Sequence, residues 1–345
     1  MSRTSRGRLV SAILRTAWRV RPDPLDVAPE RLAAVLPLLL SPSGLAALAW
    51  WRFRHSDGGQ TMPGALETER GLVASQAVLH RRDLRRAVAR LRDASVEPIL
   101  VKGWAIGRLY PDPHMRPSGD LDLCVREADF GAARQALLGE RSLPVDLHRG
   151  FGNLDEEDER LLFRRSVLVD CQGISVRVLA AEDHLRVLCT HMLRHGVSRP
   201  LWLCDVALAL EARPSAFDWA RCLGPRRQTA EWVTCAIGLA HCLLGARIDD
   251  TPRQVRARQL PSWLVPTVLR QWGRQHRAVR PLADHRSHPL RLLAEIAAHW
   301  PNGVQATVAL RRSPGAGSRL PYQVAASLQG LTRFARGVVG RRSSD

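Results

Sequence analysis

The chain has 345 residues, of which 45% are hydrophobic, so it is long enough for two or three packed units with a sizeable core. Seven cysteines, an odd number with no C-x-x-C pair, argue against a disulfide framework or a zinc site and favour a reduced, cytoplasmic protein. The basic first 21 residues lack the apolar stretch of a secretory signal, and the uncharged stretch 32–51 is interrupted by Pro37 and by residues 41–44. We therefore expect no membrane span.

The positive charge of the chain is unevenly distributed. The formal net charge is +18, and residues 252–345 contain 16 arginines, no lysine and 3 acidic residues, which gives this region a net charge of +13. A basic region of this kind suits an acidic or nucleic-acid partner. A solvated, arginine-rich helical surface without a partner explains the same composition, and both interpretations stay open.

Apolar periodicity divides the chain into helical flanks and a short core that contains strands. Residues 27–54 are expected to be helical with a break at 41–44, and residues 64–95 have the spacing of one long amphipathic helix. The core segments, in chain order, are a strand at 98–101, a helical stretch at 104–110, a strand at 121–125, a helix at 127–138, a strand at 143–147, a helix at 154–165 and a hairpin of 166–170 with 174–179. Later segments are helical, with candidate helices at 181–195, 201–211, 217–223, 228–244, 266–275, 288–298 and 323–338.

This order of elements predicts an α/β (α+β) fold, in which helices flank a small mixed sheet and a largely helical C-terminal region follows. We expect four regions along the chain. They are an N-terminal helical region at 1–95, the α/β core at 96–180, a helical domain packed on the core at 181–250, and a basic helical region at 251–345.

Three acidic residues are placed to share one site. Asp120 and Asp122 are two apart, and on a strand both carboxylates would point to the same face. Two close carboxylates repel each other, and a divalent ion with oxygen ligands relieves that repulsion. Asp146 has the same apolar neighbours on another strand candidate. We therefore predict that Asp120, Asp122 and Asp146 bind metal and take part in catalysis, as in phosphoryl-transfer sites.

Four residues near these acids suit phosphate groups. Lys102 and Gly103 end one strand candidate and begin a helical stretch, where a glycine allows close backbone approach to an anion. Lys102 is the only lysine in the chain, which indicates that a compact point charge is needed there. Arg116 and Ser118 lie just before the acids and can donate hydrogen bonds to phosphate oxygens. We predict that all four bind the nucleotide.

Taken together, these motifs resemble nucleotidyltransferases of the DNA polymerase β-like superfamily. The similarity is greatest to a bacterial subgroup in which Lys-Gly replaces the usual Gly-Ser, and it covers about residues 30–245. The segments that carry it are 101–103 (Val-Lys-Gly), 116–123 (Arg-Pro-Ser-Gly-Asp-Leu-Asp-Leu), 145–148 (Val-Asp-Leu-His), 191–195 (His-Met-Leu-Arg-His) and 202–205 (Trp-Leu-Cys-Asp).

The resemblance implies a mixed sheet with flanking helices, Mg²⁺ as cofactor and an NTP as donor. It also implies that Asp120 and Asp122 bind the metal, with Asp146 as the third acid, and that Gly103 and Ser118 lie near the phosphates. The predicted function is Mg²⁺-dependent transfer of an NMP to the hydroxyl of an unidentified acceptor, which is a small molecule, a protein or an RNA.

Two alternatives remain. Trp104 follows Gly103 where the superfamily has a serine, which favours a catalytically inactive nucleotide-binding module of the same fold. The basic C-terminal region favours an RNA-binding protein. Three histidines also have expected roles near the site. His191 and His195 are expected to pack against the core or contact the acceptor rather than bind metal, while His148 shares a strand face with Asp146 and can orient a carboxylate.

Overall fold

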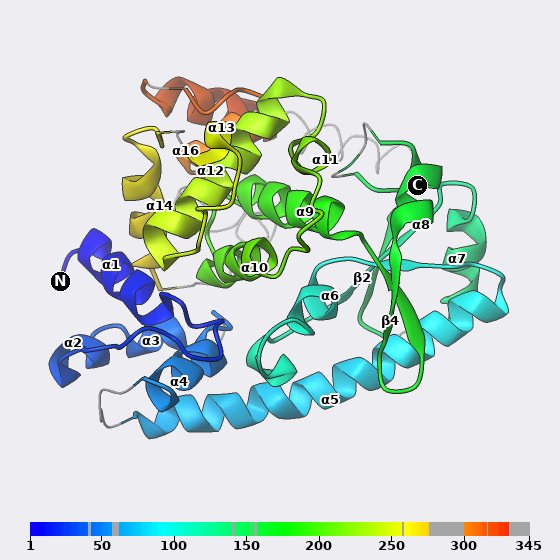
Figure 1. Ribbon diagram of the computed structural model, residues 1–345, viewed down its shortest axis with the longest axis horizontal. Helices are drawn as coiled ribbons and strands as arrows, with labels where there is room; N and C mark the ends of the chain where they lie inside the picture. Colours follow the sequence, from blue (N-terminus) through cyan, green and yellow to red (C-terminus); the bar gives the residue numbers. More distant parts are fainter. Residues whose placement is uncertain are drawn as a thin grey trace, which may run out of the picture.

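The centre of the fold is a mixed five-stranded sheet, which confirms the predicted α+β class (Figure 1). The computed structural model describes residues 1–40, 43–56, 62–139, 142–152, 154, 157–256, 259–275, 300–315 and 317–330. The strands are β1 (Ile99–Leu100), β2 (Leu121–Val125), β3 (Val145–Arg149), β4 (Val167–Asp170) and β5 (Ser175–Val178). Their order is β3-β2-β1-β5-β4, with the pairs β2–β3 and β1–β5 parallel and the pairs β1–β2 and β4–β5 antiparallel.

Helices surround the sheet and make up most of the other described residues. Before the sheet come α1 (Arg3–Leu14), α2 (Pro29–Ala33), α3 (Leu36–Leu39), α4 (Ala46–Arg54) and α5 (Gly64–Asp93). Between the strands lie α6 (Gly103–Gly107), the 3-10 turn η1 (Pro113–Met115), α7 (Phe130–Ala136) and α8 (Glu159–Arg165). After the sheet come α9 (Ala181–Arg194), α10 (Pro200–Glu211), α11 (Trp219–Leu223), α12 (Arg227–Leu244), α13 (Arg253–Arg256), α14 (Leu264–Trp272) and α16 (Gly303–Ala309).

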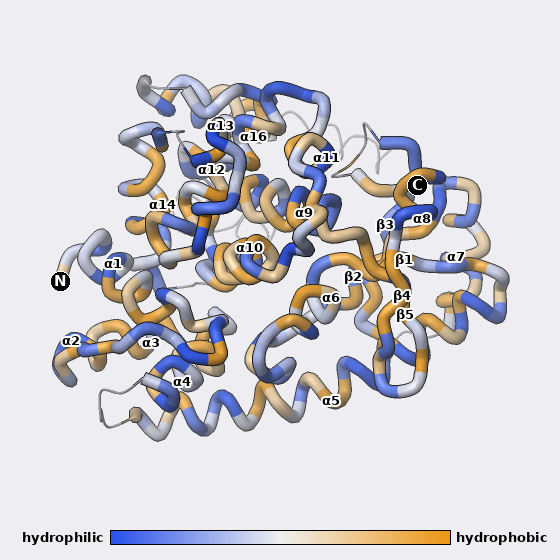
Figure 2. The backbone as a smooth tube through the Cα atoms, viewed as in Figure 1, coloured by the Kyte–Doolittle hydropathy of each residue, from blue (hydrophilic) through white to orange (hydrophobic). Residues whose placement is uncertain are grey.

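One face of the sheet is covered by the long helix α5. Alternation along β2 points Leu121 and Leu123 to this face, as the sequence predicts. They belong to the same apolar cluster as Leu84, Val88 and Leu91 of α5, at the helical spacing that directs one stripe of α5 inward. In Figure 2, α5 accordingly alternates between hydrophobic and hydrophilic colour along its length.

The opposite face of the sheet is covered by α8 and by the start of α9. Ile99 and Cys124 pack there with Phe163 of α8 and Val187 of α9. Asp122 is two residues from Cys124 and therefore shares this face. The predicted metal-binding residue Asp122 thus lies where the sheet meets the helices that follow it.

The C-terminal helices form a second and larger core. Helices α9, α10 and α12 pack on one another, and α1 packs on α4, α12 and α14. The first helix of the chain therefore lies against a helix of the C-terminal third (Figure 1). This contact is close, because a Cβ added at Gly7 would overlap the carbonyl oxygen of Leu269, and one added at Gly273 would overlap that of Arg3.

Most predicted elements are present, with shifted ends. The hairpin of β4 and β5 forms as predicted, and the predicted helices at 181–195, 201–211 and 228–244 correspond to α9, α10 and α12. The helices α1, α13 and α16 were not predicted. Helix α16 is short and starts at a glycine, but the Asn302 side chain caps it by accepting a hydrogen bond from the Gln305 amide.

Some expectations fall outside the described residues. The predicted helix at 288–298 and the end of that at 323–338 lie there, although residues 320–330 are helical. Among the described helices none is long and apolar enough to cross a membrane. All seven cysteines lie within the described residues and are free. The division into four regions, the partner of the basic region and the cytoplasmic location stay predictions.

Candidate active site

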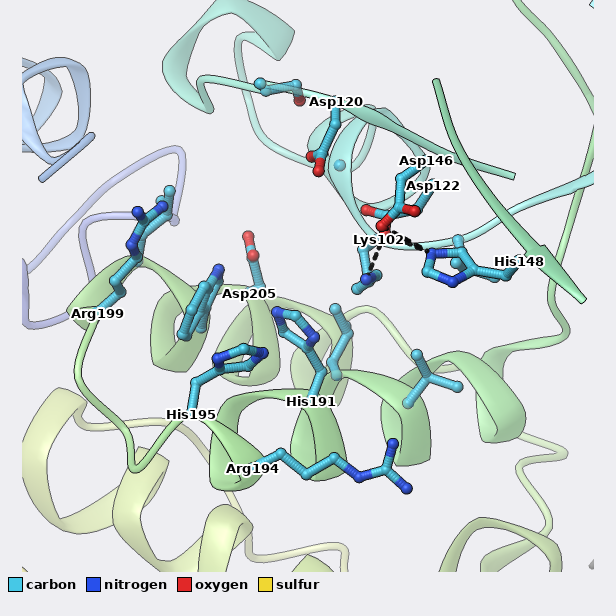
Figure 3. Close-up of a pocket in the computed structure, with 18 of the residues that line it drawn as sticks. Lys102, Asp120, Asp122, Asp146, His148, His191, Arg194, His195, Arg199 and Asp205 are labelled. Atoms are coloured by element: carbon cyan, nitrogen blue, oxygen red, sulfur yellow. Dashed lines mark hydrogen bonds and ion pairs between the residues drawn. The ribbon is translucent and has the colours of Figure 1, made fainter. Parts of the chain in front are cut away.

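Parallel pairing of β2 with β3 places two acidic residues side by side. In this register Asp122 lies opposite Asp146, and Cys124 lies opposite His148. One potential ligand atom from each of Asp122, Asp146 and His148 lies within 4.8 Å of the other two. Figure 3 shows the two carboxylates together, with the His148 ring beside them. This arrangement offers a cation two carboxylates, with an imidazole nitrogen as a third potential ligand.

Asp122 has two close partners of its own. Its Oδ1 lies 2.5 Å from Lys102 Nζ and 3.0 Å from His148 Nε2. The same His148 nitrogen is 3.3 Å from Asp146 Oδ2, so His148 joins the two acids. Burial alone would raise the pKa of Asp122, but the hydrogen bonds from His148 and Lys102 outweigh burial and hold that pKa below its usual value. Asp122 is therefore a carboxylate at neutral pH.

Lys102 reaches Asp122 from an unusual backbone conformation. Its φ is 55° and its ψ is −149°, a region that is almost confined to glycine. Gly103 follows with a φ of +40°. The Val101 amide also donates to the Asp122 carbonyl, which ties the end of β1 to β2. The sharp turn after β1 thus directs the lysine side chain onto the neighbouring strand.

Arg116 lies in the site but is already paired. It is 8% exposed, and its Nε and Nη2 donate to the Asp205 carboxylate of α10, with the closest contact at 2.9 Å. The Tyr110 hydroxyl donates to the same carboxylate at 2.9 Å. The remaining Arg116 nitrogen, Nη1, donates to Pro117 O and to Ser118 Oγ. Arg116 therefore fixes the loop before β2 against α10.

The other predicted residues lie around this loop. Asp120 is exposed and is not among the three residues that form the cluster on β2 and β3, although its carboxylate points into the cleft (Figure 3). Gly103 lies beside Ser118, since a Cβ added at Gly103 would be 3.7 Å from Ser118 Oγ. Lys102, Gly103, Arg116, Ser118, Asp120, Asp122 and Asp146, the seven residues predicted from the sequence, all line one cleft of about 770 Å³.

The wall of the cleft across from the acids comes from α9 and α10. His191 and His195 lie with ring centroids 4.7 Å apart, and Trp202 lies 4.8 Å from His191. The Arg199 guanidinium lies over the Trp202 ring, 5.3 Å from its centroid. Burial, and then the nearby positive charge of Lys102, lower the pKa of His191 to about 3, and the same two causes lower that of His195. Both imidazoles are therefore neutral at physiological pH.

Sequence reasoning missed two features of this site. The pairing of Asp205 with Arg116 spans 89 residues, and the only signal for it was that Asp205 lies in a segment of the family resemblance. The second is Arg199, which lines the cleft without an ion pair among the described residues. No local pattern distinguishes this arginine from the many others in the chain.

The sequence matches a protein family described as uncharacterised nucleotidyltransferase, over residues 38–141 and 139–245. The chain belongs to this family. The first matched segment contributes Lys102 and Asp122, and the second contributes Asp146, His148 and the wall formed by α9 and α10. The cleft therefore lies where the two matched segments meet. No curated protein and no solved structure gives a significant match.

Proposed function

We propose that the protein transfers an NMP group from an NTP to an acceptor hydroxyl in the cleft, with Mg²⁺ as cofactor. The observation that carries the proposal is the convergence of Asp122, Asp146 and His148, within 4.8 Å, at a cleft of about 770 Å³. This volume falls within the range of small-molecule sites, about 300–1,000 Å³. Membership of a nucleotidyltransferase family supports the same chemistry.

The ligands of the metal would be Asp122 and Asp146, with Asp120 joining them from the mouth of the cleft. When bound, a divalent ion offsets the negative charge of the phosphates and of the leaving group. His148 contacts both acids and holds their carboxylates in place. Ser118 and the Gly103 backbone would contact phosphate oxygens, and Arg116 would keep Ser118 in position through its hydrogen bond.

In the proposed reaction, the acceptor oxygen attacks the α-phosphorus of the NTP and a new P–O bond forms. The bond between the α-phosphorus and the oxygen that bridges to the β-phosphate breaks, and pyrophosphate leaves. The acceptor proton passes to Asp146, whose side chain is 53% exposed and so can reach both the acceptor and solvent. The products are an acceptor–NMP ester and pyrophosphate.

The test is incubation of the protein with each α-³²P-labelled NTP, Mg²⁺ and a cell extract, followed by separation of small molecules, proteins and RNA. We expect label in one of these fractions and release of pyrophosphate. The double variant Asp120→Ala/Asp122→Ala serves as control. Equal labelling by this variant would refute the assignment of the site.

A second candidate is a nucleotide-binding module without turnover. It is favoured by the ion pair between Lys102 and Asp122, which already neutralises a metal-binding acid, and by Trp104 in place of serine. In that case the protein binds NTPs but releases no pyrophosphate with any extract. Binding and pyrophosphate assays on the same preparation separate the two candidates.

A third possibility, RNA binding by the basic C-terminal region, stays a prediction. Because α14 and α16 pack in the core, removal of everything after Thr251 would disturb the fold. A better test replaces Arg333, Arg336, Arg341 and Arg342 by Gln in the full chain. If this region binds RNA, these changes weaken binding and make it less dependent on salt.

A further inference from the structure

The ammonium group of Lys102 lies close to the position that a metal bound to Asp122 would occupy. Its Nζ is 2.5 Å from Asp122 Oδ1, and a Mg²⁺ ion binds oxygen at about 2.1 Å. His148 takes the other contact to this oxygen, at 3.0 Å. The Lys102 and Asp122 side chains are only 13% and 8% exposed, so water screens this ion pair weakly.

We propose that Lys102 is an internal counter-ion, which neutralises Asp122 until a divalent cation binds there and then moves onto the phosphates of the donor. The inference rests on the proposed function, because it assigns the phosphates of an NTP as the second partner of the lysine. It predicts that the lysine and the divalent cation compete for Asp122.

The backbone supports a need for the charge of Lys102. A non-glycine residue with φ 55° and ψ −149° is strained, and glycine would relieve that strain. A lysine therefore stands at a position whose backbone angles favour glycine. What the lysine adds at this position is its positive charge beside Asp122.

Of the two cations predicted to bind phosphate, Lys102 and Arg116, Lys102 is the one available to move. Arg116 is held by Asp205 through a buried pair with both partners below 10% exposure. Lys102 has one carboxylate partner among the described residues, and that partner is a proposed metal ligand. A lysine chain with rotatable bonds can leave one oxygen for another a few ångströms away, whereas a buried guanidinium fixed by several hydrogen bonds does not.

The experiment measures Mn²⁺ binding without nucleotide, by electron paramagnetic resonance of free Mn²⁺, for the wild type and Lys102→Met. Removal of a positive charge next to two acids is expected to tighten Mn²⁺ binding by roughly tenfold. With saturating Mn²⁺, the same change is expected to weaken binding of an α,β-methylene NTP by roughly tenfold. Tighter Mn²⁺ binding together with weaker binding of the NTP analogue indicates competition for Asp122. If Lys102 had a purely structural role, Lys102→Met would weaken the binding of both ligands.

Two further variants act as controls. Arg199→Met also removes a positive charge from the cleft but has no ion pair with the acids, so Mn²⁺ affinity should change by less than about threefold. Lys102→Gly relieves the backbone strain and should bind Mn²⁺ as tightly as Lys102→Met. Equal affinities would show that the effect in Lys102→Met comes from the lost charge and not from a folding defect.

The outcomes separate this inference from the proposed function. Unchanged or weaker Mn²⁺ binding in both Lys102 variants overturns the counter-ion role, even when nucleotidyl transfer is observed. Tighter Mn²⁺ binding with weaker NTP binding supports it, whether or not an acceptor is labelled. If the wild type binds Mn²⁺ but no NTP, both the second half of the inference and the proposed function are wrong.

Discussion

Asp146 is the more accessible of the two acids that face each other across β2 and β3, and in the proposed reaction this difference assigns them different roles. Asp122 is buried and held by Lys102 and His148, whereas the Asp146 side chain is 53% exposed. We expect Asp146→Asn to lower single-turnover transfer by about 10²–10⁴-fold, as loss of a general base typically does. Rapid-quench measurement with labelled NTP checks this. If the single-turnover rate of Asp146→Asn falls by less than about threefold, Asp146 is not the general base.

Buried His184 is expected to make the free energy of unfolding depend on pH. Burial, and then the positive charges of Arg108 and Arg116, lower the pKa of His184 to about 3. The unfolded chain, with a histidine pKa near 6.5, therefore binds a proton first as the pH falls. Stability that is fully present above about pH 6.5 is lost on acidification, by about 2 kcal/mol at pH 5.

Urea denaturation of the wild type and of His184→Leu between pH 5 and pH 8 measures this loss. The variant should lack that part of the pH dependence, although His80 and His191, whose pKa values burial also lowers, keep theirs. Parallel curves for the two proteins would show that His184 does not contribute.

Sequence reasoning located the residues of the cleft better than their contacts. Alternation around Asp122 was enough to place Leu121 and Leu123 in the core and the acid on the opposite face. Local patterns carry such information because a strand repeats every two residues. They carry none about the partner of Arg116, because Asp205 lies on a helix 89 residues later in the chain. That Arg116 also contacts the nucleotide stays a prediction.

At the scale of elements, the pair of Arg116 and Asp205 joins the loop before β2 to α10. Asp205 is 0% exposed, and loss of its charge would leave the buried Arg116 guanidinium without the counter-charge that Asp205 supplies. We expect Asp205→Asn to lower the free energy of unfolding by about 3–5 kcal/mol. The double change Arg116→Met/Asp205→Leu should cost less than the single change, because it leaves no buried charge.

Chemical denaturation of both variants and of the wild type gives these differences. A double variant that is less stable than Asp205→Asn would mean that the pair contributes through its specific geometry rather than by satisfying a buried charge. Transfer activity should fall in both variants, since the loop that carries Ser118 and Asp120 loses its anchor.

The same limit of local patterns explains which strands and helices could be predicted from the sequence and which could not. The hairpin of β4 and β5 was predictable from two apolar runs around Cys171, Gln172 and Gly173. The order of strands in the sheet was not, because β1 pairs with β2 in one direction and with the distant β5 in the other. Helix α1 was missed because its apolar side becomes evident only against α14.

At the scale of the whole molecule, Gly7 and Gly273 set the distance between α1 and α14. A side chain at either position would overlap the backbone of the opposite helix. We expect Gly7→Ala to lower the free energy of unfolding by about 1–3 kcal/mol, as overpacking does. Gly64→Ala is the matched control, because nothing lies within 4 Å of a Cβ added there. Equal thermal midpoints for Gly7→Ala and Gly64→Ala would show that α1 and α14 can move apart without loss of stability.

The packing of α1 on α14 also bears on how the protein is made. Helix α1 leaves the ribosome about 250 residues before α14 is complete, and at 5–20 residues per second that interval is roughly 10–50 s. During this time Leu9, Val10 and Ile13 have no finished surface to cover them. The nascent chain therefore exposes an apolar helix that a chaperone can bind, and α1 reaches its final place only after α14 has been made.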